Sequence, residues 1–133
     1  MTYVVAYIAT AVVFLGLDAI WLSRVALGMY RSELGNLLLE KPNLAVAGAF
    51  YLIYIAGIVI LAIVPALGDG GWIKALLMGA VLGLVAYGTY DITNLSTLNG
   101  YTVRIALTDL AWGTALTAVS ATVGYLVVKA LNL

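Results

Sequence analysis

The segments LAVAGAFYLIYIAGIVILAIVPAL (residues 44–67) and WIKALLMGAVLGLVAYGTYDITNL (residues 72–95), joined by GDGG (residues 68–71), decide the fold of this chain. Each long segment is apolar and has about the ~20 residues that an α-helix needs to cross a ~30 Å hydrocarbon layer. The connection between them has only four residues, three of which are glycine. The pattern therefore predicts two membrane helices joined by a tight turn.

Two further apolar segments flank this hairpin, at about residues 2–22 and 104–128. Short connections between successive helices are typical of an up-down bundle. The composition agrees, because 65% of the residues are hydrophobic and 9% are charged, whereas soluble domains contain roughly 25% charged residues. A chain this short could not hide so much apolar surface from water. We predict an all-α integral membrane protein, one domain over residues 1–133, with four antiparallel transmembrane helices.

The connection GMYRSELGNLLLEKPN, residues 28–43, mixes leucines with charged residues. This pattern favours a short helix that lies in the membrane interface and ends before Pro42, because proline disfavours a helical conformation of its predecessor. A plain solvated loop is the alternative. The segment 1–22 has no basic amino-terminal region, so we expect it to stay in the protein as a membrane helix.

Basic residues that flank membrane spans indicate orientation, because they are enriched on the cytoplasmic side. The side with the 28–43 connection and the loop before residue 104 carries more of them than the opposite side. We therefore expect both of these connections in the cytoplasm and both termini outside. The first side has Arg24, Arg31, Lys41 and Arg104, and the other has Lys74, Lys129 and the amino terminus.

Three aspartates fall inside the predicted spans, at Asp18, Asp91 and Asp109. At a rise of ~1.5 Å per residue, Asp18 and Asp91 lie ~24 Å into helices that run toward the 28–43 side, and Asp109 lies ~7.5 Å into a helix that starts there. Because alternate helices run in opposite directions, all three acids converge on one leaflet. The other half of the bundle is almost entirely aliphatic residues and glycine.

A carboxylate inside a bilayer costs about 2.5–3.5 kcal/mol on insertion scales, and it usually points inward to a partner. We therefore expect a hydrogen-bonded polar cup that opens to the cytoplasmic interface, with at least one aspartate protonated or paired to an arginine. Phenols, indoles, an amide and two arginines occur at the same depth. The candidate ligand-binding residues are Asp18, Trp21, Arg24, Tyr51, Tyr54, Tyr87, Tyr90, Asp91, Asn94, Arg104, Asp109 and Trp112.

The alternative interpretation is that the polar and small residues only hold the helices together, because small residues and interhelical hydrogen bonds replace the hydrophobic drive in lipid. Gly79 and Gly83 share a helix stripe with Tyr87 and Asp91, since these residues recur every four positions. The elements DAIW (18–21) and DLAW (109–112) form either a weak inverted repeat or a chance recurrence.

Several classes of function are excluded by what the sequence lacks. The chain has no Cys and no His, which excludes disulfides, zinc sites and haem ligation. Its six basic and six acidic residues cancel, so no electrostatic footprint for nucleic acid exists. We expect no metal and no cofactor. Whether the protein is an enzyme stays open, because no set of nucleophile, base and orienting residue can be picked out.

The motifs FLGLDAIWL, FYLIYIAG, YGTYDITNLSTLNGY and DLAWGT resemble a widespread bacterial family of small four-helix predicted membrane proteins, catalogued as a domain of unknown function. The resemblance covers nearly the whole chain. It implies one domain and a multi-pass location in the bacterial inner (cytoplasmic) membrane, and it implies no established activity or catalytic residues.

We therefore predict that the protein binds, and as a further option modifies, a membrane-resident amphiphile such as a lipid or fatty acid through the polar cup. One alternative is an accessory or scaffold subunit that packs through small-residue helix faces onto itself or a larger membrane partner. Another is proton-coupled transport by an oligomer, because one chain has no polar lining through both leaflets.

Overall fold

The computed structural model describes residues 1–38, 41 and 43–133, and the described residues form helices without strands. Four continuous helical segments are long and apolar enough to cross a membrane: Thr2–Leu37, Leu44–Gly68, Gly71–Thr97 and Val103–Ala130. The predicted all-α membrane fold is confirmed. In chain order the elements are α1 (Thr2–Trp21), η1 (Leu22–Ala26), α2 (Leu27–Leu34), η2 (Gly35–Leu37), α3 (Leu44–Ile58), η3 (Val59–Ile63), α4 (Val64–Gly68), α5 (Gly71–Thr97) and α6 (Val103–Ala130).

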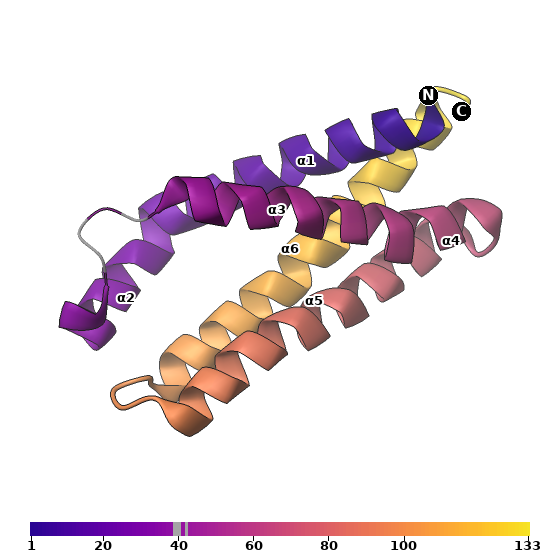
Figure 1. Cartoon of the computed structure of the whole chain (residues 1–133). Helices are drawn as coiled ribbons and strands as arrows, with labels where there is room; N and C mark the ends of the chain where they lie inside the picture. The colour runs from indigo at the N-terminus through magenta and orange to yellow at the C-terminus, as the bar shows by residue number, and fades with distance from the viewer. Residues whose placement is uncertain (39–40, 42) are drawn as a thin grey trace.

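The long helices run back and forth between two ends of the molecule (Figure 1). Both termini and the turn between α4 and α5 lie at one end, and α2 and the 98–102 connection lie at the other. The contacts between α5 and α6 show that these two helices are antiparallel. Gly79 of α5 faces Ala121 of α6, whereas Gly88 faces Leu110, so residue numbers rise along one helix as they fall along the other.

The first helical segment is longer than the sequence pattern predicted. After Trp21 the chain passes through one π-helical segment, η1, and continues as α2. The interfacial helix predicted within residues 28–43 is therefore a continuation of the first span. The helix ends where Gly35 takes a positive φ of 52°, a conformation that glycine adopts without a steric cost. The predicted end before Pro42 lies outside the described residues.

The remaining predicted helix ends differ from the structure by three residues or fewer, and two helix starts are capped by side chains. Asn43 accepts a hydrogen bond from the Val46 N–H at 3.1 Å, and Thr102 accepts one from the Ile105 N–H at 3.1 Å. Side-chain oxygens at this position satisfy backbone donors that the first turn leaves free.

The closest helix pair, α5 and α6, packs through the glycine stripe. A Cβ atom on Gly79 would lie 2.9 Å from both the Ala121 Cβ and the Thr117 carbonyl oxygen. A Cβ atom on Gly83 would lie 2.9 Å from the Thr114 Cα. Small residues let helix backbones approach closely in lipid. The glycine stripe is therefore a helix interface within the chain. The packing interpretation predicted this role for the stripe.

The second helix pair, formed by α1 and α3, positions the candidate site. α3 packs on α1, and α1 packs on α6. The segment η3 contacts α5, α6 and α1, so the two helix pairs meet there. The helices α3 and α5 diverge from η3 toward the end of the molecule that carries α2 (Figure 1). A second small core, formed by Met29, Tyr101, Ile105 and Ala106, joins α2 to the start of α6 at that end.

Candidate functional site

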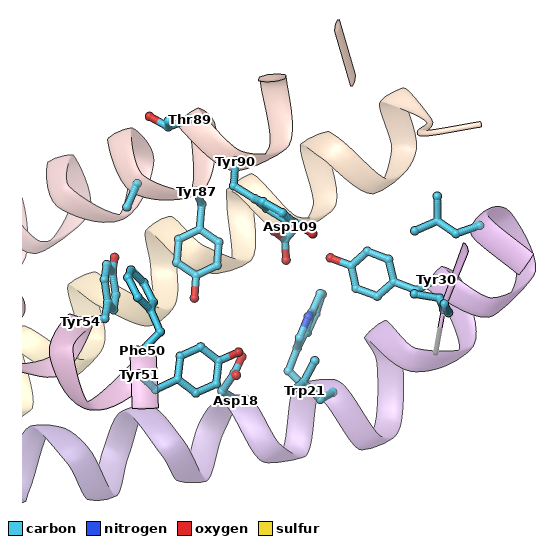
Figure 2. Close-up of a pocket in the computed structure, with 14 residues that line it drawn as sticks. Asp18, Trp21, Tyr30, Phe50, Tyr51, Tyr54, Tyr87, Thr89, Tyr90 and Asp109 are labelled. Atoms are coloured by element: carbon cyan, nitrogen blue, oxygen red, sulfur yellow. The ribbon is translucent and has the colours of Figure 1, made fainter. Parts of the chain in front are cut away.

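A cavity of about 750 Å³ lies where α3 and α5 diverge. Residues from five of the helices, from η1 and from the segment after η2 line it, and Figure 2 shows most of the aromatic rings and two carboxyl groups around one space. The lining residues are Asp18, Trp21, Leu22, Tyr30, Leu34, Leu38, Phe50, Tyr51, Tyr54, Ala86, Tyr87, Thr89, Tyr90 and Asp109.

Asp18, on α1, is 5% exposed and is held in place by α6. The indole Nε1–H of Trp112 donates a hydrogen bond of 3.1 Å to Asp18 Oδ1. The Trp112 ring also stacks on Trp21, with ring centroids 4.5 Å apart and planes 6° from parallel. The DAIW and DLAW elements of the sequence are thus in contact. The phenol of Tyr51 lies beside the same carboxyl group (Figure 2).

Asp109, on α6, is 8% exposed and points into the cavity from the opposite wall (Figure 2). The phenol of Tyr30, on α2, reaches toward it. Tyr30 is in this position because the first helix continues through η1 instead of ending at Leu22. Two carboxyl groups from different helices therefore face one space, and each has a tyrosine beside it.

Asp91 lies behind the cavity, with 0% of its surface exposed. The Tyr101 hydroxyl donates a hydrogen bond of 2.6 Å to Asp91 Oδ1, and Oδ2 has no hydrogen-bond partner. The carboxyl group of Asp109 is its acidic neighbour across the α5–α6 interface. Burial, and then the bonded Asp91, raise the pKa of Tyr101. The phenol therefore keeps its proton at neutral pH and serves as a donor.

Aromatic rings fix the deep wall of the cavity. Phe14 contacts Tyr51 at a centroid distance of 5.7 Å and Tyr54 at 5.5 Å. Tyr54 contacts Tyr87 edge to face at 6.1 Å, and its hydroxyl is hydrogen-bonded to the Thr117 hydroxyl at 2.9 Å. Edge-to-face pairs at these distances are a favoured arrangement of aromatic side chains. The rings form a connected layer from α1 to α5.

The structure brings most of the predicted site residues together. Trp112 contacts two of the cavity-lining residues, Asp91 lies behind the cavity, and Asn94 is half-buried on α5 close to Tyr101. Arg24 and Arg104 are exposed and do not line the cavity. Their predicted pairing to an aspartate stays a prediction, as does ligand binding. Seven predicted residues line the cavity: Asp18, Trp21, Tyr51, Tyr54, Tyr87, Tyr90 and Asp109.

Sequence reasoning missed Tyr30, Phe50 and Tyr101. Tyr30 falls in a segment whose composition indicates a connection, and a helical periodicity of 3.6 does not carry across the π-helical segment η1. Tyr101 follows Asp91 by ten residues, and only the turn at Gly100 returns it to that carboxyl group. Phe50 lies on the same helix as Tyr51 and Tyr54 and gave no polar signal.

The described residues contain no group of three or more acidic, histidine or cysteine side chains that could hold a metal ion. With Asp18, Asp91 and Asp109 as its main polar groups, the site offers carboxyl, phenol and indole groups for binding or proton transfer.

The model of the family described as "Predicted membrane protein (DUF2177)" matches residues 3–126. The chain belongs to this family. The match includes the second and third membrane-length helical segments and most of the first and fourth, so the whole cavity lies within the family domain. The resemblance read from the sequence motifs is confirmed, and family and fold together identify a predicted multi-pass membrane protein. No curated protein and no solved structure matches the chain.

Proposed function

We propose that this protein binds a membrane-resident amphiphile in the cavity between α3 and α5. The polar end of the ligand lies between Asp18 and Asp109, and its hydrocarbon chain leaves between the two diverging helices into the bilayer. The observation that carries the proposal is a cavity that combines two buried carboxyl groups with an apolar, exposed rim.

The size of the cavity supports a ligand. Its volume of about 750 Å³ lies within the ~300–1,000 Å³ that is typical of small-molecule sites. Rings and aliphatic side chains form most of the lining, and a few convergent polar groups are set among them, which is the usual composition of such sites.

The rim supports entry from the lipid phase. Phe50 on α3 is 59% exposed and Tyr90 on α5 is 55% exposed. Leu22 in η1, also exposed, completes an apolar edge. An acyl chain that passes this edge moves from one hydrocarbon environment to another, so the hydrocarbon part of the ligand meets little resistance.

The acids support a polar headgroup. Carboxyl groups inside a bilayer are costly and mark functional sites by default. Asp91 serves the α5–α6 interface through Tyr101, whereas Asp18 and Asp109 face the open space. The glycine stripe that the scaffold alternative would offer to a partner is already occupied, because Gly79 and Gly83 contact α6.

The proposal places the protein in a bacterial cytoplasmic membrane, with the cavity in the leaflet that carries most of the flanking basic residues. Membrane lipid is then its direct partner, and assembly with further copies or with a larger membrane protein is compatible with this role. The proposal assigns binding and no reaction.

The test is to fill the cavity without touching its acids. Ala86 lines the cavity from α5, and Ala111 is exposed on α6 outside it. We expect native mass spectrometry of protein extracted from membranes to show a retained amphiphile in the wild type and in Ala111→Phe, and its loss in Ala86→Phe. Equal retention in both variants would place the ligand elsewhere.

A further inference from the structure

The charges around the cavity all have one sign. Asp18 and Asp109 line it, and among the described residues no basic side chain does. The basic residues on this side of the molecule, Arg24, Arg31, Lys41 and Arg104, are exposed and outside the lining. The headgroup that this space accepts must therefore complement carboxyl groups alone.

We propose that the cavity selects amphiphiles with a positively charged alkylammonium headgroup. The inference rests on the proposed function and deepens it by naming the class of ligand. It gives no contact with the headgroup to Arg24 and Arg104, which the sequence predicted as ligand-binding residues.

Electrostatics favours a cation over an anion at this position. A phosphate or carboxylate headgroup would meet Asp18 and Asp109 with no positive group in the lining to offset the repulsion. Like charges repel more strongly in a site shielded from water than at an exposed surface, because the effective dielectric constant is lower. An ammonium group compensates the same carboxyl groups and lowers the cost of holding them inside the membrane.

The aromatic lining favours the same class of headgroup. Figure 2 shows the rings of Trp21, Tyr30, Tyr51 and Tyr87 around the space between the two carboxyl groups, with the hydroxyl ends of Tyr30 and Tyr87 directed into it. The faces of such rings attract cations, and aromatic cages are the recurrent means of binding quaternary ammonium ligands. A neutral hydroxyl headgroup could bond to the carboxyl groups and phenols, but it carries no charge for the aromatic rings to attract.

One side chain, Trp112, supports both Asp18 and a wall of the cavity. Trp112 donates to Asp18 and stacks on Trp21, so the carboxyl group and one wall of the cage are fixed by the same side chain. Preorganised groups bind with less loss of conformational entropy than mobile ones. Asp18 and Trp21 are therefore already in place when the headgroup arrives.

The experiment compares three probes that share one hydrocarbon chain: dodecyltrimethylammonium, dodecanol and dodecanoate. The protein is purified in an uncharged alkyl maltoside detergent. Binding is followed by the fluorescence of the stacked pair Trp21 and Trp112 in a Trp72→Phe background, since Trp72 is exposed outside the cavity. We expect saturable binding of the ammonium probe that is about tenfold tighter than that of either other probe, as a desolvated cation–π contact would give.

The variants separate this inference from the proposed function. Asp18→Asn and Asp109→Asn should each remove most of the ammonium preference, whereas Asp69→Asn, in the exposed turn before α5, should keep it. Equal binding of all three probes that Ala86→Phe abolishes would overturn the headgroup inference and leave amphiphile binding intact. A preference for dodecanoate would also overturn it. Saturable binding of none of the probes would contradict both proposals. If an aspartate variant fails to fold, the comparison of the three probes on the protein with both aspartates still tests the headgroup inference.

Discussion

At the scale of single residues, the site depends on how each buried carboxyl group is satisfied. Asp18 has an indole donor, Asp91 has a phenol donor, and Asp109 faces the cavity. The sequence predicted that the three acids converge, because their depths follow from the helix rise. It did not predict Tyr101 as the partner of Asp91, since that pairing depends on the course of the chain through residues 98–102.

The Trp112–Asp18 bond predicts the effect of removing one donor. Trp112→Phe keeps a ring that can stack on Trp21, but it removes the N–H that donates a hydrogen bond to Asp18. We expect a loss of about 1–3 kcal/mol in the free energy of unfolding, the usual cost of a buried group left without its partner. Unfolding in mixed detergent micelles measures it. Trp72→Phe, at an exposed position, is the control, and equal losses in the two variants would refute the assignment.

Tyr101→Phe tests the second bond in the same way. Both oxygens of Asp91 would then lack a partner in a site with no exposed surface. We expect destabilisation by about 1–3 kcal/mol, whereas Tyr3→Phe, at an exposed tyrosine of α1, should change the unfolding free energy little. If Tyr101→Phe proves as stable as the wild type, the hydrogen bond does not stabilise the fold.

At the scale of the helices, hydropathy predicted the four spans well because each span must match the thickness of the bilayer. The turn at residues 68–71 and the glycine stripe of α5 were predicted for similar reasons, since tight turns and close helix contacts demand small residues. The continuation of the first helix was not predicted. Its polar composition after Ala26 is typical of a connection, and the π-helical segment shifts the faces of α2 relative to α1.

The α5–α6 contact predicts opposite outcomes for two glycine substitutions. A Cβ at Gly83 would lie 2.9 Å from the Thr114 Cα, whereas a Cβ at Gly16 of α1 would meet nothing within 4 Å. We expect Gly83→Ala to destabilise the protein by about 1–3 kcal/mol through overpacking and Gly16→Ala to be neutral or stabilising. Thermal unfolding of the two purified variants measures both. A harmless Gly83→Ala would mean that the two helices are farther apart than described.

At the scale of the whole molecule, two helical hairpins meet at η3 and diverge toward the end that carries α2 (Figure 1). This divergence creates the cavity, and it could not be read from the sequence because helix periodicity gives faces but not the angles between helices. The orientation with both termini outside stays a prediction. At this scale the proposed function depends on one claim, that the space between α3 and α5 binds a membrane-resident amphiphile.

The most direct test of that claim is photocrosslinking with a diazirine-labelled alkylammonium amphiphile, followed by peptide mass spectrometry. We expect adducts on residues 50–54 of α3 and 86–90 of α5 that excess unlabelled amphiphile removes. Adducts scattered over exposed positions outside the cavity, such as Val4, Ile60 and Leu126, and unaffected by the competitor, would contradict it.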